Sequence, residues 1–167
     1  MGADITRILV PVDFSPHSDA AVAYGARLAA RLNATIQLLH VVEDPFLTGA
    51  WSADLYIPDV GRMIESAVTS ARQRLETLVP AAAAHGAPVT ADVVVGAPSK
   101  AIPDYAETNG FDLILMGTHG RTGLTHALLG SVAERVLRHA PCAVLTLKGP
   151  AKPAAPARPL FNEAVVV

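Results

Sequence analysis

The glycine-rich segment at residues 116–136 combines residue types that could bind a phosphate group. Gly117 and Gly120 would let the backbone approach a ligand closely, because glycine carries no Cβ atom. Gly130 and Ser131 precede a helical pattern, and the first turn of a helix offers unpaired N–H groups and partial positive charge. The spacing matches neither G-x-x-x-x-G-K-S/T nor G-x-G-x-x-G. These residues therefore favour an anion site that is built from backbone groups.

Several of these residues also have a purely structural interpretation. The first two glycines could serve a tight turn, and Ser131 with Glu134 forms an S-x-x-E capping box, in which the hydroxyl caps its own helix. Arg121 could add a charged contact to a phosphate, whereas His119 could lie on the surface. No group of His, Cys and acidic residues has a spacing that is typical of a metal site. The segment alone leaves both phosphate binding and helix capping open.

Asp13 is the other residue that could do chemistry. It ends the apolar run Arg7–Asp13 and precedes a helical pattern. Its carboxylate could be a catalytic or phospho-accepting group, or it could cap the helix that follows. No G-x-S-x-G motif surrounds Ser131, so serine hydrolysis is not expected.

Strand-like apolar runs alternate with amphipathic helical runs along the chain. The expected strands are Arg7–Asp13, Thr35–Val42, Val89–Gly96, Phe111–Gly117 and Cys142–Lys148. The expected helices are Ala21–Leu32, Val60–Val79, Ser99–Thr108 and Ser131–Ala140. This alternation implies right-handed crossovers, and strands that are apolar on both faces imply a parallel sheet covered on both sides. The sequence predicts a single α/β domain, residues 4–148, with an open, doubly wound, five-stranded parallel sheet.

The carboxyl ends of the strands are the expected place for a ligand, because open parallel sheets bind ligands there, where the strand order reverses. Three predicted strand ends carry the candidates. The first ends at Asp13, the second ends in "LLHVV" at Val42, and the fourth leads into the glycine-rich segment at Met116.

The composition limits the function classes. Of 167 residues, 51% are hydrophobic and 17% charged, and the net charge is −2, without a dense Lys/Arg run. Such a chain can build a core, and a nucleic-acid partner is not expected. The single cysteine favours a reducing cytoplasm. No apolar run approaches the ~20 residues of a membrane span, and the N-terminus does not resemble a signal peptide.

Two segments fall outside the alternating pattern. The long connection 43–60 carries Phe46, Trp51 and Tyr56, and it is either a lid packed on the domain or the flank of a ligand or partner site. The tail 149–167 is rich in Pro and Ala, which is typical of a semi-rigid linker. Its last residues, "AVVV", could add as a strand to a sheet edge.

The chain resembles the ATP-binding branch of the universal stress protein family. That branch carries G-x2-G-x9-G-S/T, which Gly117, Gly120, Gly130 and Ser131 match without a gap. "VPVDFS", "LLHVV", "VVVGAP" and "CAVLTLK" resemble the family in the same order, over about residues 5–148. The resemblance implies a Rossmann-like fold of the adenine nucleotide alpha-hydrolase type.

The resemblance also implies a role for each strand end. The adenosine side would be lined by Pro11, Val12 and Asp13, with Asp13 near the ribose, while Val41 would meet adenine through its backbone. Under the nucleoside would lie Met116 and Gly117. The phosphates would contact Gly120, Gly130, Ser131 and Val132, and the neighbouring side chains of His119 and Arg121 could reach them.

The family resemblance further implies a homodimer, formed by antiparallel pairing of the last strand, residues 142–148. An apolar edge strand without protective charges agrees with this expectation. We expect ATP binding with Mg²⁺ held mainly by the phosphates, no catalytic residues for rapid turnover, and a regulatory role in the stress response. The alternatives are a slow ATPase that uses the same pocket and a nucleotide-free dimeric interaction module.

Overall fold

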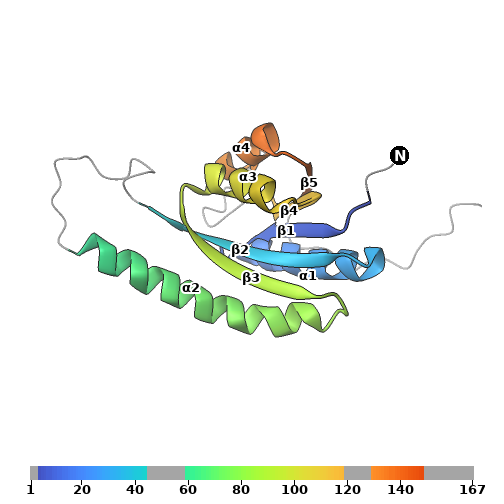
Figure 1. Cartoon of the computed structure of the whole chain (residues 1–167), viewed down its shortest axis with the longest axis horizontal. Coiled ribbons are helices and arrows are strands. Elements are labelled where there is room, and N and C mark those ends of the chain that lie inside the picture. Colours follow the sequence, from blue (N-terminus) through green and yellow to red (C-terminus); the bar gives the residue numbers. More distant parts are fainter. Residues whose placement is uncertain (1–3, 45–58, 119–128, 149–167) are drawn as a thin grey trace, which may run out of the picture.

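The computed structural model describes residues 4–44, 59–118 and 129–148, in which strands and helices alternate (Figure 1). The strands are β1 (Arg7–Pro11), β2 (Thr35–Glu43), β3 (Val89–Gly96), β4 (Leu113–Gly117) and β5 (Ala143–Leu147). The helices are α1 (Pro16–Leu32), α2 (Val60–Ala83), α3 (Pro98–Asn109) and α4 (Ser131–His139). Each expected element is present, and only the ends shift.

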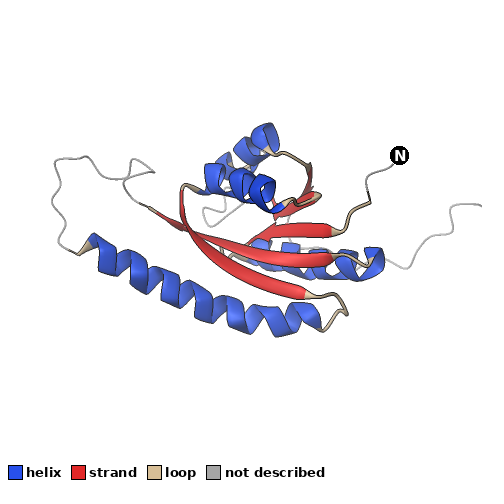
Figure 2. Ribbon diagram, viewed as in Figure 1, coloured by secondary structure: helices blue, strands red, loops and turns tan. Residues whose placement is uncertain are grey.

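The five strands form one parallel sheet in the order β3-β2-β1-β4-β5 (Figure 2). From β1 the chain first builds β2 and β3 on one side, and then crosses to build β4 and β5 on the other. The strand order therefore reverses between β1 and β4, which is the position where sheets of this kind bind ligands. The predicted fold class, an open and doubly wound parallel α/β sheet, is confirmed.

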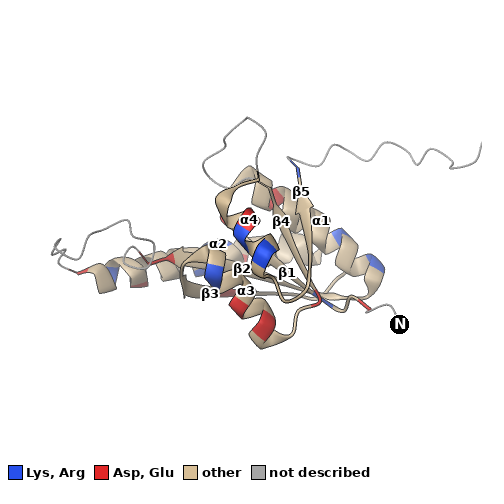
Figure 3. Cartoon of the chain, turned by 90° about the horizontal axis from the view of Figure 1, so that it is seen from above, with Lys and Arg blue, Asp and Glu red and all other residues tan. Residues whose placement is uncertain are grey.

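The helices cover the sheet in two layers that follow from the alternation of side chains along each strand. Helices α1 and α2 pack on the face that carries Ile8 and Val10, whereas α3 and α4 pack on the opposite face, which carries Leu9 (Figure 1). These three β1 side chains are fully buried. Lys, Arg, Asp and Glu are carried mainly by the helices (Figure 3). In the part of the chain described, no helix is both long and apolar enough to cross a membrane.

The ends of β1 and α1 differ from the sequence expectation. Strand β1 stops at Pro11, and α1 begins at Pro16, five residues before the predicted Ala21. The reason lies in Ser15, whose side chain accepts a hydrogen bond from the Ser18 backbone N–H at 3.3 Å and so caps the helix. Proline then occupies the first helical turn, where its missing N–H costs nothing.

At the amino edge of the sheet, Asp112 joins the entrance of β4 to the entrance of β1. Its Oδ2 atom accepts hydrogen bonds from the Thr6 N–H at 2.9 Å, the Thr6 hydroxyl at 2.8 Å and the Arg7 N–H at 2.8 Å. The bonds from Thr6, with a smaller contribution from Arg7, hold the pKa of Asp112 below its ordinary value. This carboxylate serves the pairing of the two central strands.

Candidate functional site

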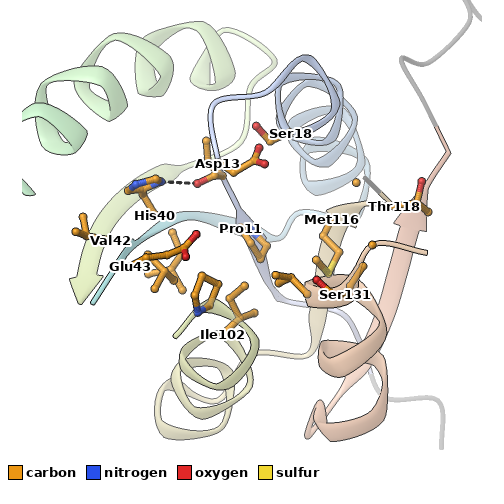
Figure 4. A pocket seen from close by; sticks show the side chains of 18 of the residues that line it. Pro11, Asp13, Ser18, His40, Val42, Glu43, Ile102, Met116, Thr118 and Ser131 are labelled. Carbon is orange, nitrogen blue, oxygen red and sulfur yellow. Dashed lines mark hydrogen bonds between the residues drawn. The ribbon is translucent and has the colours of Figure 1, made fainter. Parts of the chain in front are cut away.

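A cavity of about 700 Å³ opens at the carboxyl edge of the sheet, at the reversal between β1 and β4 (Figure 4). Its size lies within the range of small-molecule sites. Nine of the predicted site residues line it, from three strand ends and the start of α4: Pro11, Val12, Asp13, Val41, Met116, Gly117, Gly130, Ser131 and Val132. The other three, His119, Gly120 and Arg121, lie outside the described residues, as do most of the 43–60 connection and the 149–167 tail.

One side of the cavity is apolar. Leu39, Val41, Ile102 and Met116 line it, and each is at most 8% exposed. They come from β2, α3 and β4 and belong to the core beneath α3 and α4. A flat, weakly polar group such as a nucleobase could be desolvated here without leaving a buried polar side chain unpaired.

Asp13 stands in the turn between β1 and α1, with its carboxylate at the cavity wall (Figure 4). Of its two open interpretations, the helix cap is wrong, because Ser15 is the N-cap of α1. Asp13 Oδ1 instead accepts a hydrogen bond from the Ser15 N–H at 3.0 Å, which stabilises the turn locally. Its carboxylate is therefore presented to the cavity from a turn rather than from a strand.

Gly117 ends β4 directly below the first turn of α1. Its backbone lies outside the left-handed region, so a tight turn does not explain the glycine. A Cβ atom at this position would lie 3.1 Å from the Cβ of His17 and 3.3 Å from the His17 backbone carbonyl. The close packing of α1 on β4 therefore favours a glycine here, and Gly117 also lines the cavity.

Gly130, near the end of the glycine-rich segment, is joined by a hydrogen bond to Thr118, near its beginning. Its N–H donates to the Thr118 carbonyl oxygen at 2.8 Å, and the Thr118 N–H and hydroxyl in turn donate to the Leu147 carbonyl at 2.9 and 3.2 Å. Gly130 is the N-cap of α4, with φ −60° and ψ 149°. The first turn of α4 therefore begins at the cavity, with Ser131, Val132 and Ala133 in its lining.

The capping box predicted for Ser131 and Glu134 is wrong. Ser131 is the first helical residue rather than the N-cap, so Glu134 lies one residue too far along for the motif. The Glu134 carboxylate instead pairs with Arg138 at 2.9 Å, one turn further along the helix. The Ser131 hydroxyl is thus not committed to the box and stands at the cavity.

Charge is distributed unevenly around the cavity. Within its described lining, Asp13 and Glu43 are acidic and no Lys or Arg occurs. The first turn of α4 is a source of positive potential there, through N–H groups that have no carbonyl partner within the helix. No cluster of three or more His, Cys, Asp or Glu suited to a metal ion occurs among the residues that the structure describes.

Sequence reasoning missed several lining residues, among them His40, Glu43, Ile102 and Thr118. Two local signals could have found some of them. His40 and Glu43 flank the predicted strand end at Val42, and side chains on both faces of a strand reach the sheet edge where the strand stops. Ile102 lies in the first turns of the helix that follows the third strand, and such turns face the same edge.

Comparison with known proteins gives a consistent result. The sequence model of the universal stress protein family matches residues 4–148. Universal stress protein MJ0531 of Methanocaldococcus jannaschii is 32% identical over 151 residues, which are 87% of this chain and 84% of the relative. The solved structure of MJ0577, from the same organism, has a TM-score of 0.74 at 28% identity and covers 91% of this chain and 100% of its own. A universal stress protein in complex with cAMP has a TM-score of 0.59 at 26% identity, covering 87% and 98%.

Proposed function

The chain belongs to the universal stress protein family, and on this premise we propose that it binds an adenine nucleotide, ATP, and regulates partners according to its nucleotide state. One observation carries the proposal: a single cavity at the strand-order reversal joins an apolar side, a carboxylate and the first turn of a helix. These suit a base, a ribose and a phosphate chain, respectively. The similar structure that holds cAMP supports an adenine nucleotide.

The proposed contacts follow the course of the cavity. The nucleoside lies along Pro11, Val12 and Asp13, meets the backbone of Val41, and rests on Met116 and Gly117. The phosphates lie at Gly130, Ser131 and Val132, where the first turn of α4 begins. We include Gly120, His119 and Arg121 in the phosphate site on the strength of the family motif alone.

Mg²⁺ is proposed to be held mainly by the phosphates. The described residues offer no cluster for a resident metal ion, and Mg²⁺ readily keeps several water ligands. Slow ATP hydrolysis in the same cavity is the second candidate function, because Asp13 places a carboxylate in the wall that could orient a water molecule.

Calorimetric titration of ATP into the nucleotide-free protein, with and without Mg²⁺, tests the proposal. Gly130→Val should abolish binding and keep the fold, because the φ and ψ of Gly130 are accessible to any residue. Gly61→Val is the matched control, since Gly61 faces open space on α2, outside the cavity lining. Absence of binding to the unmodified protein at about 1 mM ATP would favour the nucleotide-free interaction module instead.

We also propose a homodimer through residues 142–148 and a nucleotide-binding domain that comprises residues 4–148. Strand β5 is an edge strand that pairs with β4, and four of its five residues are half-buried in the single chain. Such an edge, without a charged residue in the strand itself, tends to pair with another chain. Sedimentation equilibrium should report a dimer, and a chain that ends at Lys148 should still dimerise and bind ATP.

A further inference from the structure

We propose that His40 is a positioning residue of the nucleotide site, which holds the turn that presents Asp13. The inference rests on the proposed function and assigns a role to His40, a residue of the cavity lining, that is exerted through Asp13. The His40 Nδ1 atom lies 2.6 Å from the Val12 carbonyl oxygen, across from β2 to the end of β1 (Figure 4). A carbonyl oxygen can only accept, so Nδ1 carries the proton and donates it.

Val12 is fixed on both of its backbone groups. Its N–H donates to the Leu39 carbonyl at 2.8 Å, and its carbonyl accepts from His40. These two partners are consecutive residues of β2, so they hold the peptide before Asp13 at one position relative to the sheet. The Val12 side chain is 3% exposed, which limits movement further.

Phe14 fixes the other side of Asp13. It has a φ of +61°, a left-handed conformation that a bulky residue adopts only when its surroundings impose it. Its ring lies 4.5 Å from the ring of His40, between centroids, and the Arg74 guanidinium lies 3.8 Å from the Phe14 centroid. The rings of Phe14 and His40 are tilted by 36° from each other, and the contacts among Arg74, Phe14 and His40 join α2 to the turn and to β2.

His40 thus acts on Asp13 from both directions. It donates a hydrogen bond to the residue before Asp13 and makes a ring contact with the residue after it, while Ser15 donates to the Asp13 carboxylate. The backbone of Asp13 is held before any ligand arrives, so its carboxylate does not have to be ordered during binding.

Two substitutions separate the donor from the ring. His40→Asn keeps an N–H donor at the δ position and removes the ring, whereas His40→Phe keeps a stacking ring and removes the donor. Because the donor holds Val12, His40→Phe should lower the affinity for ATP about threefold to tenfold relative to the unmodified protein. His40→Asn keeps the donor and should therefore keep most of the affinity of the unmodified protein. His85→Phe, at an exposed position outside the cavity lining, is the matched control and should leave affinity unchanged.

A double-mutant cycle tests whether the effect passes through Asp13. Asp13→Asn should weaken ATP binding less in the His40→Phe background than in the unmodified protein. Additive effects of Asp13→Asn and His40→Phe would overturn the role of His40. So would an unchanged affinity of His40→Phe, or an affinity of His40→Asn as low as that of His40→Phe. Failure of the unmodified protein to bind ATP would instead overturn the proposed function, and this inference with it.

Discussion

Asp13 and Asp112 lie at opposite edges of the same sheet and have different roles. At the amino edge, Asp112 Oδ2 accepts three hydrogen bonds that join the entrances of β1 and β4. At the carboxyl edge, Asp13 follows the end of β1, accepts from the Ser15 N–H, and lines the cavity. An aspartate therefore stabilises strand pairing at one edge of the sheet, and another lines the proposed nucleotide site at the other edge.

The backbone around each residue explains the difference. At the entrance of β1, the consecutive N–H groups of Thr6 and Arg7 both donate to one carboxylate oxygen of Asp112. Beyond the end of β1, the left-handed Phe14 turns the chain into α1, and Ser15 rather than Asp13 caps the helix. Parallel sheets concentrate binding at their carboxyl edge because such turns and helix starts gather there.

Of the substitutions that compare the two edges, Asp13→Asn should have the largest effect, and the effect should be on ligand affinity. The loss of charge should weaken ATP binding about tenfold or more, as expected for a hydrogen bond to an ionised group. Stability to urea should change by less than about 0.5 kcal/mol, because the amide oxygen can still accept from Ser15. Calorimetry and urea unfolding measure the two quantities; unchanged affinity would remove Asp13 from the site.

Asp112→Ala should produce the opposite pattern. We expect a loss of about 1–2 kcal/mol in the free energy of unfolding, well below the sum for three buried hydrogen bonds to a charged group, because water reaches these groups. The affinity for ATP should stay within about twofold of the unmodified protein. A large loss of affinity without a loss of stability would contradict the assignment of strand pairing to Asp112 and of ligand binding to Asp13.

Protonation of Asp112 should remove the same stabilising contribution, so the stability should depend on pH. The pKa of Asp112 is lowered in the folded state, so its stabilisation is complete above the unfolded carboxyl pKa of about 3.9 and is lost as the pH falls through the folded pKa. The stability difference between the unmodified protein and Asp112→Ala should therefore be constant near neutral pH and shrink in acid. Urea unfolding at a series of pH values measures this, and a difference that grows in acid would contradict it.

The smallest expected effect distinguishes two serines at helix starts. Ser15→Ala should cost about 1 kcal/mol of stability, because Ser15 is a buried N-cap. Ser131→Ala should cost less than about 0.5 kcal/mol, because Ser131 follows the N-cap of α4 and makes no capping box. Equal losses, measured by thermal or urea unfolding, would restore the capping role of Ser131.

Local pattern was enough to predict the elements, and together with the family resemblance it predicted nine of the nineteen residues that line the cavity. Runs such as Leu113–Met116 are apolar on both faces, and they lie buried between two helical layers, as the alternation with helices implies. The glycine spacing brought Gly117 and Gly130 to attention, and both line the cavity together with Asp13. These signals are local in sequence or follow from the handedness of the crossovers.

Features that depend on neighbouring strands could not be predicted in the same way. The register of β1 against β2 places the Val12 carbonyl beside His40, although the two residues are far apart in the sequence. The Gly130 N–H likewise bonds to the Thr118 carbonyl oxygen, and Gly130 is the N-cap of α4 in place of Ser131, which its motif suggested. Such contacts arise only once the sheet is assembled.

Thr118 joins the first turn of α4 to the open edge of the sheet. It accepts from the Gly130 N–H and donates twice to the Leu147 carbonyl, in the strand proposed to pair with a second chain. Any free energy that links nucleotide occupancy to self-association must be reciprocal. If ATP raises the association constant of the two chains by some factor, association must raise the affinity of the chains for ATP by the corresponding factor.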